Sequence, residues 1–176
     1  RFESRQAKVQ DLQSALDYLS QRADINQDQL NVLGVCQGVN WAIEASILDK
    51  RIKALSLVAG HYLMPAVAEM YLGSIDKVKA RIQAAQQAKQ IFEKDGKVEY
   101  IPIINGLDAL LTAPVIGQFY QRWVDRGVFW DFHGLWENRI THMSEAEIWG
   151  HNIEPIIQQL NTPTLMIHAN KAASGP

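Results

Sequence analysis

The sequence predicts an α/β fold in which a mostly parallel sheet is flanked by helices. Short apolar segments at 30–35, 52–60 and 164–168 have the length and the Leu, Val and Ile content of strands. The segment 39–48, between the first two, is long enough for a helix. A strand, a helix and a second strand at this spacing are typical of a right-handed parallel unit. Because the strands are apolar along their length, we expect them to be buried, with helices on both faces of the sheet.

The remaining segments fit around this unit. Residues from about 3 to 22 repeat apolar side chains at helical spacing, which predicts an amphipathic helix that packs on the sheet. A long Ala- and Gln-rich helix is expected at 76–94, followed by a short extended piece at 96–102. We therefore expect a core α/β unit at 1–64, a helical, aromatic-rich insertion at 65–161, and a late core strand with the start of its loop at 162–176.

A Gly-x-Cys-x-Gly motif, Gly34-Val35-Cys36-Gln37-Gly38, follows the first strand directly. A strand that turns sharply into a helix at such a motif is a nucleophile elbow, which exposes its central side chain above the sheet. We expect both glycines to be required, because a Cβ at either position would clash across the turn. The alternative is a structural turn with a buried, inert cysteine, since free cysteines are often buried.

Aromatic residues are concentrated in the expected insertion. One interpretation is that they form the core of the insertion itself, since aromatic side chains bury large areas. The other is a cap over Cys36 whose inner wall is an apolar substrate pocket. The pocket candidates are Trp123, Trp130 and Trp136, and the cluster also contains Trp149, Phe119, Tyr120, Phe129 and Phe132.

Two histidines follow predicted strands. His61 comes directly after the second strand, at the edge where parallel sheets place their sites, and is a candidate base or pocket residue. His168 ends the third strand, and there we favour a structural role in a buried strand. Spacing suggests no metal site for the three histidines of the expected insertion, His133, His142 and His151.

Composition argues against several classes of partner. A formal net charge of −2 and a pI near 6.2 give no electrostatic reason to expect nucleic acid or an anionic membrane. One cysteine excludes an internal disulfide and a cysteine-rich zinc site. The sequence has no run of about 18 or more apolar residues and no signal-peptide apolar segment at its N-terminus, so we expect a cytoplasmic protein. The expected partner is a small-molecule substrate. We expect no cofactor and no metal, and the sequence is compatible with a homo-oligomer.

Taken together, these motifs resemble the α/β-hydrolase superfamily, in particular the branch around dienelactone hydrolase and polyketide-transferase-like hydrolases. The resemblance lies in 34–38, in the Asp49-Lys50-Arg51-Ile52-Lys53-Ala54 passage, and in Pro163-Thr164-Leu165-Met166-Ile167-His168. It implies that Cys36 is the nucleophile and that the backbone N–H of Gln37 is half of an oxyanion hole. Serine is the commoner nucleophile in the superfamily, and the dienelactone hydrolase branch uses cysteine.

The sequence also departs from that pattern. The acid expected after the late strand is missing from Asn170-Lys171-Ala172-Ala173. We therefore expect the chain to be a central portion of the fold, with the acid and the histidine of the triad outside it. An ester or thioester hydrolase is the favoured function. A non-catalytic protein that binds a ligand or partner, and an acyl transferase on the same scaffold, are the alternatives.

Overall fold

The computed structural model describes residues 2–125 and 137–170, and the side chains of 122–125 lie outside that description. These residues form two compact units. We call Ser4–Val67 together with His151–Pro176 the sheet unit, and Arg1–Glu3 together with Ala68–Gly150 the helical unit. None of the described helices has the length and apolar character needed to cross a membrane.

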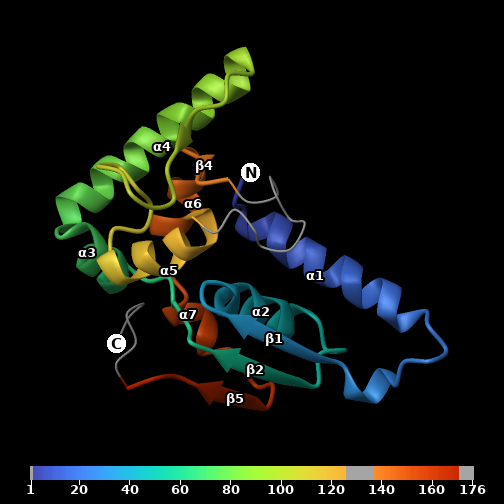
Figure 1. The fold of residues 1–176 in the computed structure, drawn as a ribbon. Helices are drawn as coiled ribbons and strands as arrows, with labels where there is room; N and C mark the ends of the chain where they lie inside the picture. The colour runs from blue at the N-terminus through green and yellow to red at the C-terminus, as the bar shows by residue number, and fades with distance from the viewer. Residues whose placement is uncertain (1, 126–136, 171–176) are drawn as a thin grey trace. The chain divides into compact units, whose positions relative to one another are not determined.

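Figure 1 shows the order of the helices and strands along the chain by colour and labels most of them. They are α1 (Arg5–Ser20), a 3-10 turn (Gln27–Gln29), β1 (Asn31–Val35), α2 (Gly38–Leu48), β2 (Ala54–Val58), α3 (Pro65–Leu72), α4 (Ile75–Asp95), β3 (Tyr100–Ile101), α5 (Pro114–Asp125), β4 (Ile140–Thr141), α6 (Ser144–Trp149), α7 (Glu154–Ile157) and β5 (Thr164–Ile167).

The sheet unit contains the predicted parallel sheet. Its strand order is β1-β2-β5, and both pairings are parallel. The prediction of a strand, helix and strand unit is confirmed, because α2 connects β1 to its parallel neighbour β2. All three strands run in the same direction, so their carboxyl ends lie at one edge of the sheet. Val35, Val58 and Ile167 are aligned in register near that edge.

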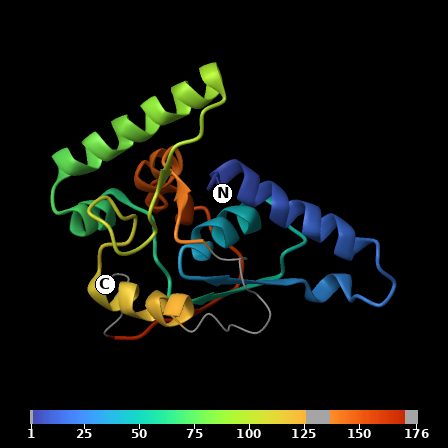
Figure 2. The same ribbon diagram turned by 45° about the horizontal axis from the view of Figure 1, so that its top comes forward.

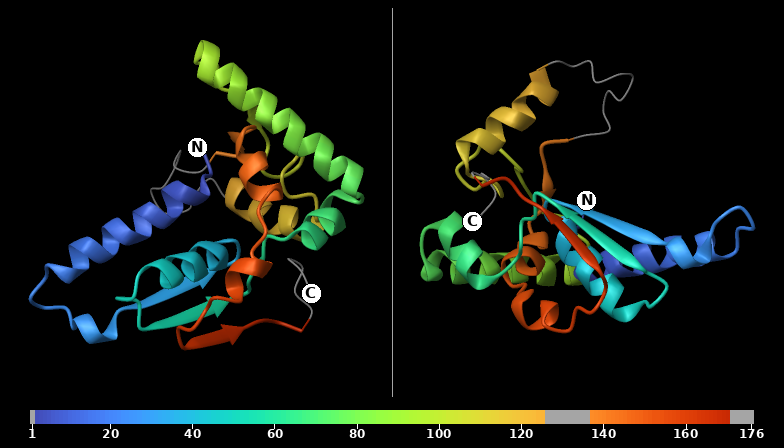
Figure 3. Two further views of the ribbon diagram at one scale, coloured as in Figure 1. Left: turned by 180° about the vertical axis from the view of Figure 1, so that it is seen from behind. Right: turned by 90° about the horizontal axis from the view of Figure 1, so that it is seen from below.

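Helix α2 covers one face of the sheet. It packs on β1 and β2, and α1 and α7 pack on α2, as the left view of Figure 3 illustrates. The covered face is where the core forms, with Leu55 and Leu57 of β2 buried beneath Val39 and Ile43 of α2. Ser4 precedes helix α1, and its hydroxyl accepts a hydrogen bond from the Ala7 N–H, so a side chain caps the first turn of the helix.

The opposite face of the sheet differs from expectation. Leu33 and Val35 of β1, and Leu165 and Ile167 of β5, are each more than half exposed. No helix of the described sheet unit packs on this face, so the prediction of buried strands with helices on both faces is wrong for these residues. Apolar composition indicates that a strand suits a buried position, but it does not specify which segment covers it.

The helical unit is built around the long helix α4, which lies beside α6 (Figure 2). Ser74 caps the first turn of α4 by accepting a hydrogen bond from the Lys77 N–H. Gly96 ends the helix with a left-handed φ of 68°, which a glycine adopts without a steric penalty. The sequence predicted this helix within one residue at each end, but not the two-residue antiparallel pair of β3 and β4.

Candidate active site

Cys36 stands between β1 and α2 at the carboxyl edge of the sheet. Its φ is +53°, a left-handed conformation that costs energy for a residue with a side chain. The backbone N–H of Cys36 donates to the Val58 carbonyl at 3.1 Å, which holds the turn to β2. The thiol-bearing residue is exposed, so the alternative of a buried cysteine does not apply.

The two glycines of the motif have different roles. A Cβ on Gly34 would lie 2.8 Å from the Val39 Cα and 3.1 Å from the Ala42 Cβ, which no small shift would relieve. Gly34 is therefore required for the close packing of β1 against α2. A Cβ on Gly38 would meet nothing within 4 Å, so the expectation that both glycines prevent a clash is wrong for Gly38.

The Gln37 N–H belongs to the peptide that links Cys36 to Gln37. The carbonyl of the same peptide, that of Cys36, accepts hydrogen bonds from the His61 N–H at 3.1 Å and the Val39 N–H at 3.3 Å. Gln37 precedes the first residue of α2, and within the described part of the chain its N–H donates no hydrogen bond. The expectation that this N–H forms half of an oxyanion hole stays a prediction.

His61 lies close to the elbow through its backbone. Its N–H contacts the Cys36 carbonyl, and its own carbonyl accepts from Asn40 Nδ2 at 2.9 Å. The side chain of His61 is only 4% exposed. The structure therefore brings His61 to the carboxyl edge near Cys36, as the sequence predicted; its role as a base stays a prediction.

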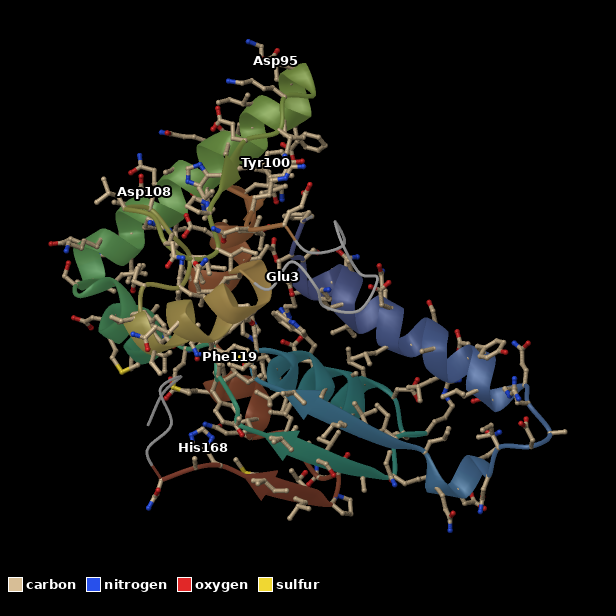
Figure 4. All side chains as sticks on the ribbon, in the orientation of Figure 1. Glu3, Asp95, Tyr100, Asp108, Phe119 and His168 are labelled. Atoms are coloured by element: carbon tan, nitrogen blue, oxygen red, sulfur yellow. The ribbon has the colours of Figure 1, made fainter. Side chains whose placement is uncertain are left out.

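His168 has a different environment from the one expected. It follows β5 at the same sheet edge and is exposed, as is every residue of β5 (Figure 4). The expectation of a histidine in a buried strand is therefore wrong, because the strand itself is not buried.

The aromatic pocket candidates are mostly outside the described structure. Trp130 and Trp136 fall among the residues that are not described, and Trp123 lies in α5 with its side chain not described. Of the other rings, Trp149 is buried and contacts Tyr71 at a centroid distance of 6.2 Å, so it belongs to the core of the helical unit. Phe119, on α5, is 52% exposed (Figure 4).

A buried charged cluster in the sheet unit was missed by the sequence analysis. Glu44 of α2 has a side chain only 3% exposed, and its Oε1 lies 3.2 Å from Nε2 of the buried His151. The Arg5 guanidinium donates to the other carboxylate oxygen. Burial raises the pKa of Glu44. Burial, together with the nearby Arg5 charge, lowers the pKa of His151 to about 4. The available signal was Glu44 itself, the one charged residue in α2.

The described residues contain no candidate metal centre, and a groove in the sheet unit lies away from Cys36. No group of three or more His, Cys, Asp or Glu side chains at 2–125 and 137–170 is arranged to hold a metal ion. A groove of about 340 Å³ lies between α1 and α2, lined in part by Arg5, Gln10 and Glu44. It is separate from the elbow.

Comparison with known proteins supports the fold. No model of a known protein family matches the chain. Over 102 residues it is 26% identical to the uncharacterized protein PA2218 of Pseudomonas aeruginosa, an alignment covering 56% of this chain and 27% of that protein. The crystal structure of PA2218 superposes on 97% of the chain with a TM-score of 0.72 and 19% identity, and the match covers 54% of that structure.

Two further solved structures are similar. One is the α/β hydrolase GrgF from Penicillium sp. sh18, with a TM-score of 0.69, 21% identity, and coverage of 99% of this chain and 56% of that one. The other is DcsB in complex with its substrate analogue, with a TM-score of 0.77, 16% identity, and coverage of 99% and 58%. The chain therefore has an α/β-hydrolase fold and spans about half the length of the solved structures it resembles.

Proposed function

We propose that the protein is an acyl hydrolase that cleaves an ester or thioester through an acyl-enzyme on Cys36. The supporting observation is the elbow itself: an exposed cysteine at a left-handed φ of 53°, followed by a peptide N–H with no partner among the described residues. A nucleophile elbow presents its nucleophile and its first oxyanion donor in this way.

The chemistry follows from these groups. The thiolate of Cys36 attacks the acyl carbonyl carbon and forms a C–S bond, while the carbonyl electron pair moves onto oxygen. The Gln37 N–H donates to that oxyanion, and its collapse expels the alcohol or thiol, which takes up a proton. Water then hydrolyses the thioester and returns the free thiol. Removing one such oxyanion donor typically lowers kcat about 10²- to 10³-fold.

The dienelactone hydrolase branch, a capping role for the aromatic stretch, and a cytoplasmic location remain part of this proposal. Within it, Trp123, Trp130 and Trp136 of the 65–161 segment remain the proposed apolar pocket residues. The acyl substrate is the only partner proposed, and the acceptor is water. The proposed base is a histidine other than His61, because His61 is only 4% exposed.

The test uses the protein encoded by the complete gene. Native protein is treated with iodoacetamide, and its burst and turnover are measured with p-nitrophenyl esters and acyl thioesters of several chain lengths. We expect alkylation without denaturant and loss of the burst in the Cys36→Ala variant. Turnover that survives Cys36→Ala, or a thiol that reacts only after denaturation, overturns the proposal.

A second variant tests the assignment of the base. Loss of a general base costs about 10²- to 10⁴-fold in rate. We therefore expect the His61→Ala variant to keep turnover within about tenfold of the unmodified protein. If His61→Ala is as inactive as Cys36→Ala, His61 is the base and this part of the proposal is wrong.

A further inference from the structure

We propose that Asn40 is a positioning residue that fixes the direction of the Gln37 N–H through the backbone of residues 61–63. This inference rests on the proposed function, since it concerns the donor that would stabilise the oxyanion. The observation behind it is a continuous set of hydrogen bonds that joins the Asn40 side chain to the peptide between Cys36 and Gln37.

The Asn40 side chain is fully buried in the first turn of α2. Its Nδ2 donates to the Gln37 carbonyl at 2.8 Å and to the His61 carbonyl at 2.9 Å. Its Oδ1 accepts from the Leu63 N–H at 3.0 Å. The amide thus uses both donor hydrogens and one acceptor on backbone groups, and ties α2 to the segment that follows β2.

That segment in turn holds the elbow. The His61 N–H donates to the Cys36 carbonyl, which also accepts from Val39. Because a peptide group is planar, the Cys36 carbonyl and the Gln37 N–H point in opposite directions in one rigid plane. Anchoring the carbonyl therefore aims the N–H. Cys36 has a strained φ, and such a conformation persists only when its surroundings hold it.

Two reactions of the same thiol separate positioning from general stability. Alkylation by iodoacetamide displaces iodide at a saturated carbon and forms no oxyanion, so it reports only the reactivity and accessibility of Cys36. Acylation by an ester forms an oxyanion and requires the Gln37 N–H. The ratio of the acylation rate to the alkylation rate therefore isolates the donor.

The experiment compares Asn40→Ala with Ser46→Ala in the protein encoded by the complete gene. Ser46 is an equally buried polar residue of α2, and among the described residues its hydroxyl donates only to the Ile43 carbonyl of the same helix. We expect Asn40→Ala to lower the ratio at least about tenfold, a part of the loss seen when an oxyanion donor is removed outright. The Ser46→Ala variant keeps the ratio unchanged. An Asn40→Ala ratio within twofold of the unmodified protein overturns the inference.

The isosteric Asn40→Asp variant covers the case in which Asn40→Ala does not fold. It keeps the acceptor for Leu63 and loses the Nδ2 donors, and division by the alkylation rate removes the effect of its charge on the thiol. We expect a lowered ratio here too, and an unchanged one counts against the inference. If no ester acylates the unmodified protein at Cys36, the proposed function itself has failed, which is a separate outcome.

Discussion

Each of the two units buries a glutamate, and the two carboxylates are compensated very differently. Glu145 of the helical unit is fully buried and accepts hydrogen bonds from Arg81 on α4 and from the Trp149 indole at 2.8 Å. Arg81 reaches both carboxylate oxygens, a bidentate geometry that is among the stronger ion pairs in proteins. These protein donors take the place of the water molecules that would solvate an exposed carboxylate.

Glu44 of the sheet unit is compensated on one side only. Its Oε2 accepts from Arg5, whose side chain is half exposed. Its Oε1 and the His151 Nε2, although only 3.2 Å apart, make no hydrogen bond within the described residues. The ring of His151 packs edge-on against Trp41, at a centroid distance of 5.3 Å. Burial therefore raises the pKa of Glu44 and lowers that of His151.

Burial alone therefore does not determine whether a charge stabilises a fold. A buried ion pair is costly to break, because one charge is left without a partner in a poorly solvated site. When one oxygen of a buried carboxylate accepts no hydrogen bond, that oxygen has lost its water and has gained no protein donor in its place. The three predictions below test this difference between Glu145 and Glu44.

The largest effect is expected when Arg81 is replaced. The Arg81→Met variant keeps much of the aliphatic stem and leaves the Glu145 carboxylate buried without its cation, so we expect the free energy of unfolding to fall by about 3–5 kcal/mol. Urea titration measures it. The matched control is Arg139→Met, which removes an ion pair with Glu137 in which both side chains are half exposed. That pair is worth about 1 kcal/mol or less. Equal losses in the two variants would contradict the comparison.

A smaller effect is expected from acidification of the Glu44 cluster. The pKa of His151 is about 4 in the folded protein against an ordinary value of 6.5. Unfolded chains therefore bind a proton that folded ones exclude, and stability falls as pH drops from 6.5 towards 4. The raised pKa of Glu44 acts in the opposite sense above 4.5. With that offset, we expect the free energy of unfolding to fall by about 2 kcal/mol as the pH drops from 6.5 towards 4.

The His151→Phe variant provides the control for this pH dependence. It keeps a ring against Trp41 and removes the titrating group. Arg5 and Glu44 are the other charged groups that face this site. We expect the unfolding free energy of the variant to vary less with pH between 6.5 and 4.5. Parallel curves for the variant and the unmodified protein would show that another group causes the loss.

The sequence predicted the parts of the fold that local patterns determine. The three strands of the sheet, α2 and α4 follow from apolar runs and from residues that start or end a helix, such as Ser74 and Gly96. The position of Cys36 on an exposed turn also followed, because strand, turn and helix are adjacent in the chain. Gly34 was predicted correctly because its neighbours across the turn are five and eight residues away.

The rest depends on contacts between residues far apart in sequence. His151 follows the helical unit in the chain but meets Glu44, 107 positions earlier, so no spacing rule predicts their contact. The role of Asn40 depends on His61 and Leu63, which reach it only after β2 is placed in the sheet. The exposure of Leu33 and Leu165 could not be predicted either, because an apolar strand has the same sequence pattern whether or not a helix packs on it.

The smallest effect is expected for Glu44→Gln at pH 7. Because Arg5 is half exposed, its attraction for the Glu44 carboxylate is screened by solvent and offsets little of the cost of burying that charge. The new amide can donate to the neutral His151 Nε2, which otherwise makes no hydrogen bond among the described residues. We therefore expect the free energy of unfolding to change by less than about 1 kcal/mol in either direction. The matched variant, Glu145→Gln, leaves the Arg81 guanidinium without its anion and costs several times more. Urea titrations of both variants at pH 7 measure the difference, and a Glu44→Gln loss equal to that of Glu145→Gln would mean that the two carboxylates are equally well compensated.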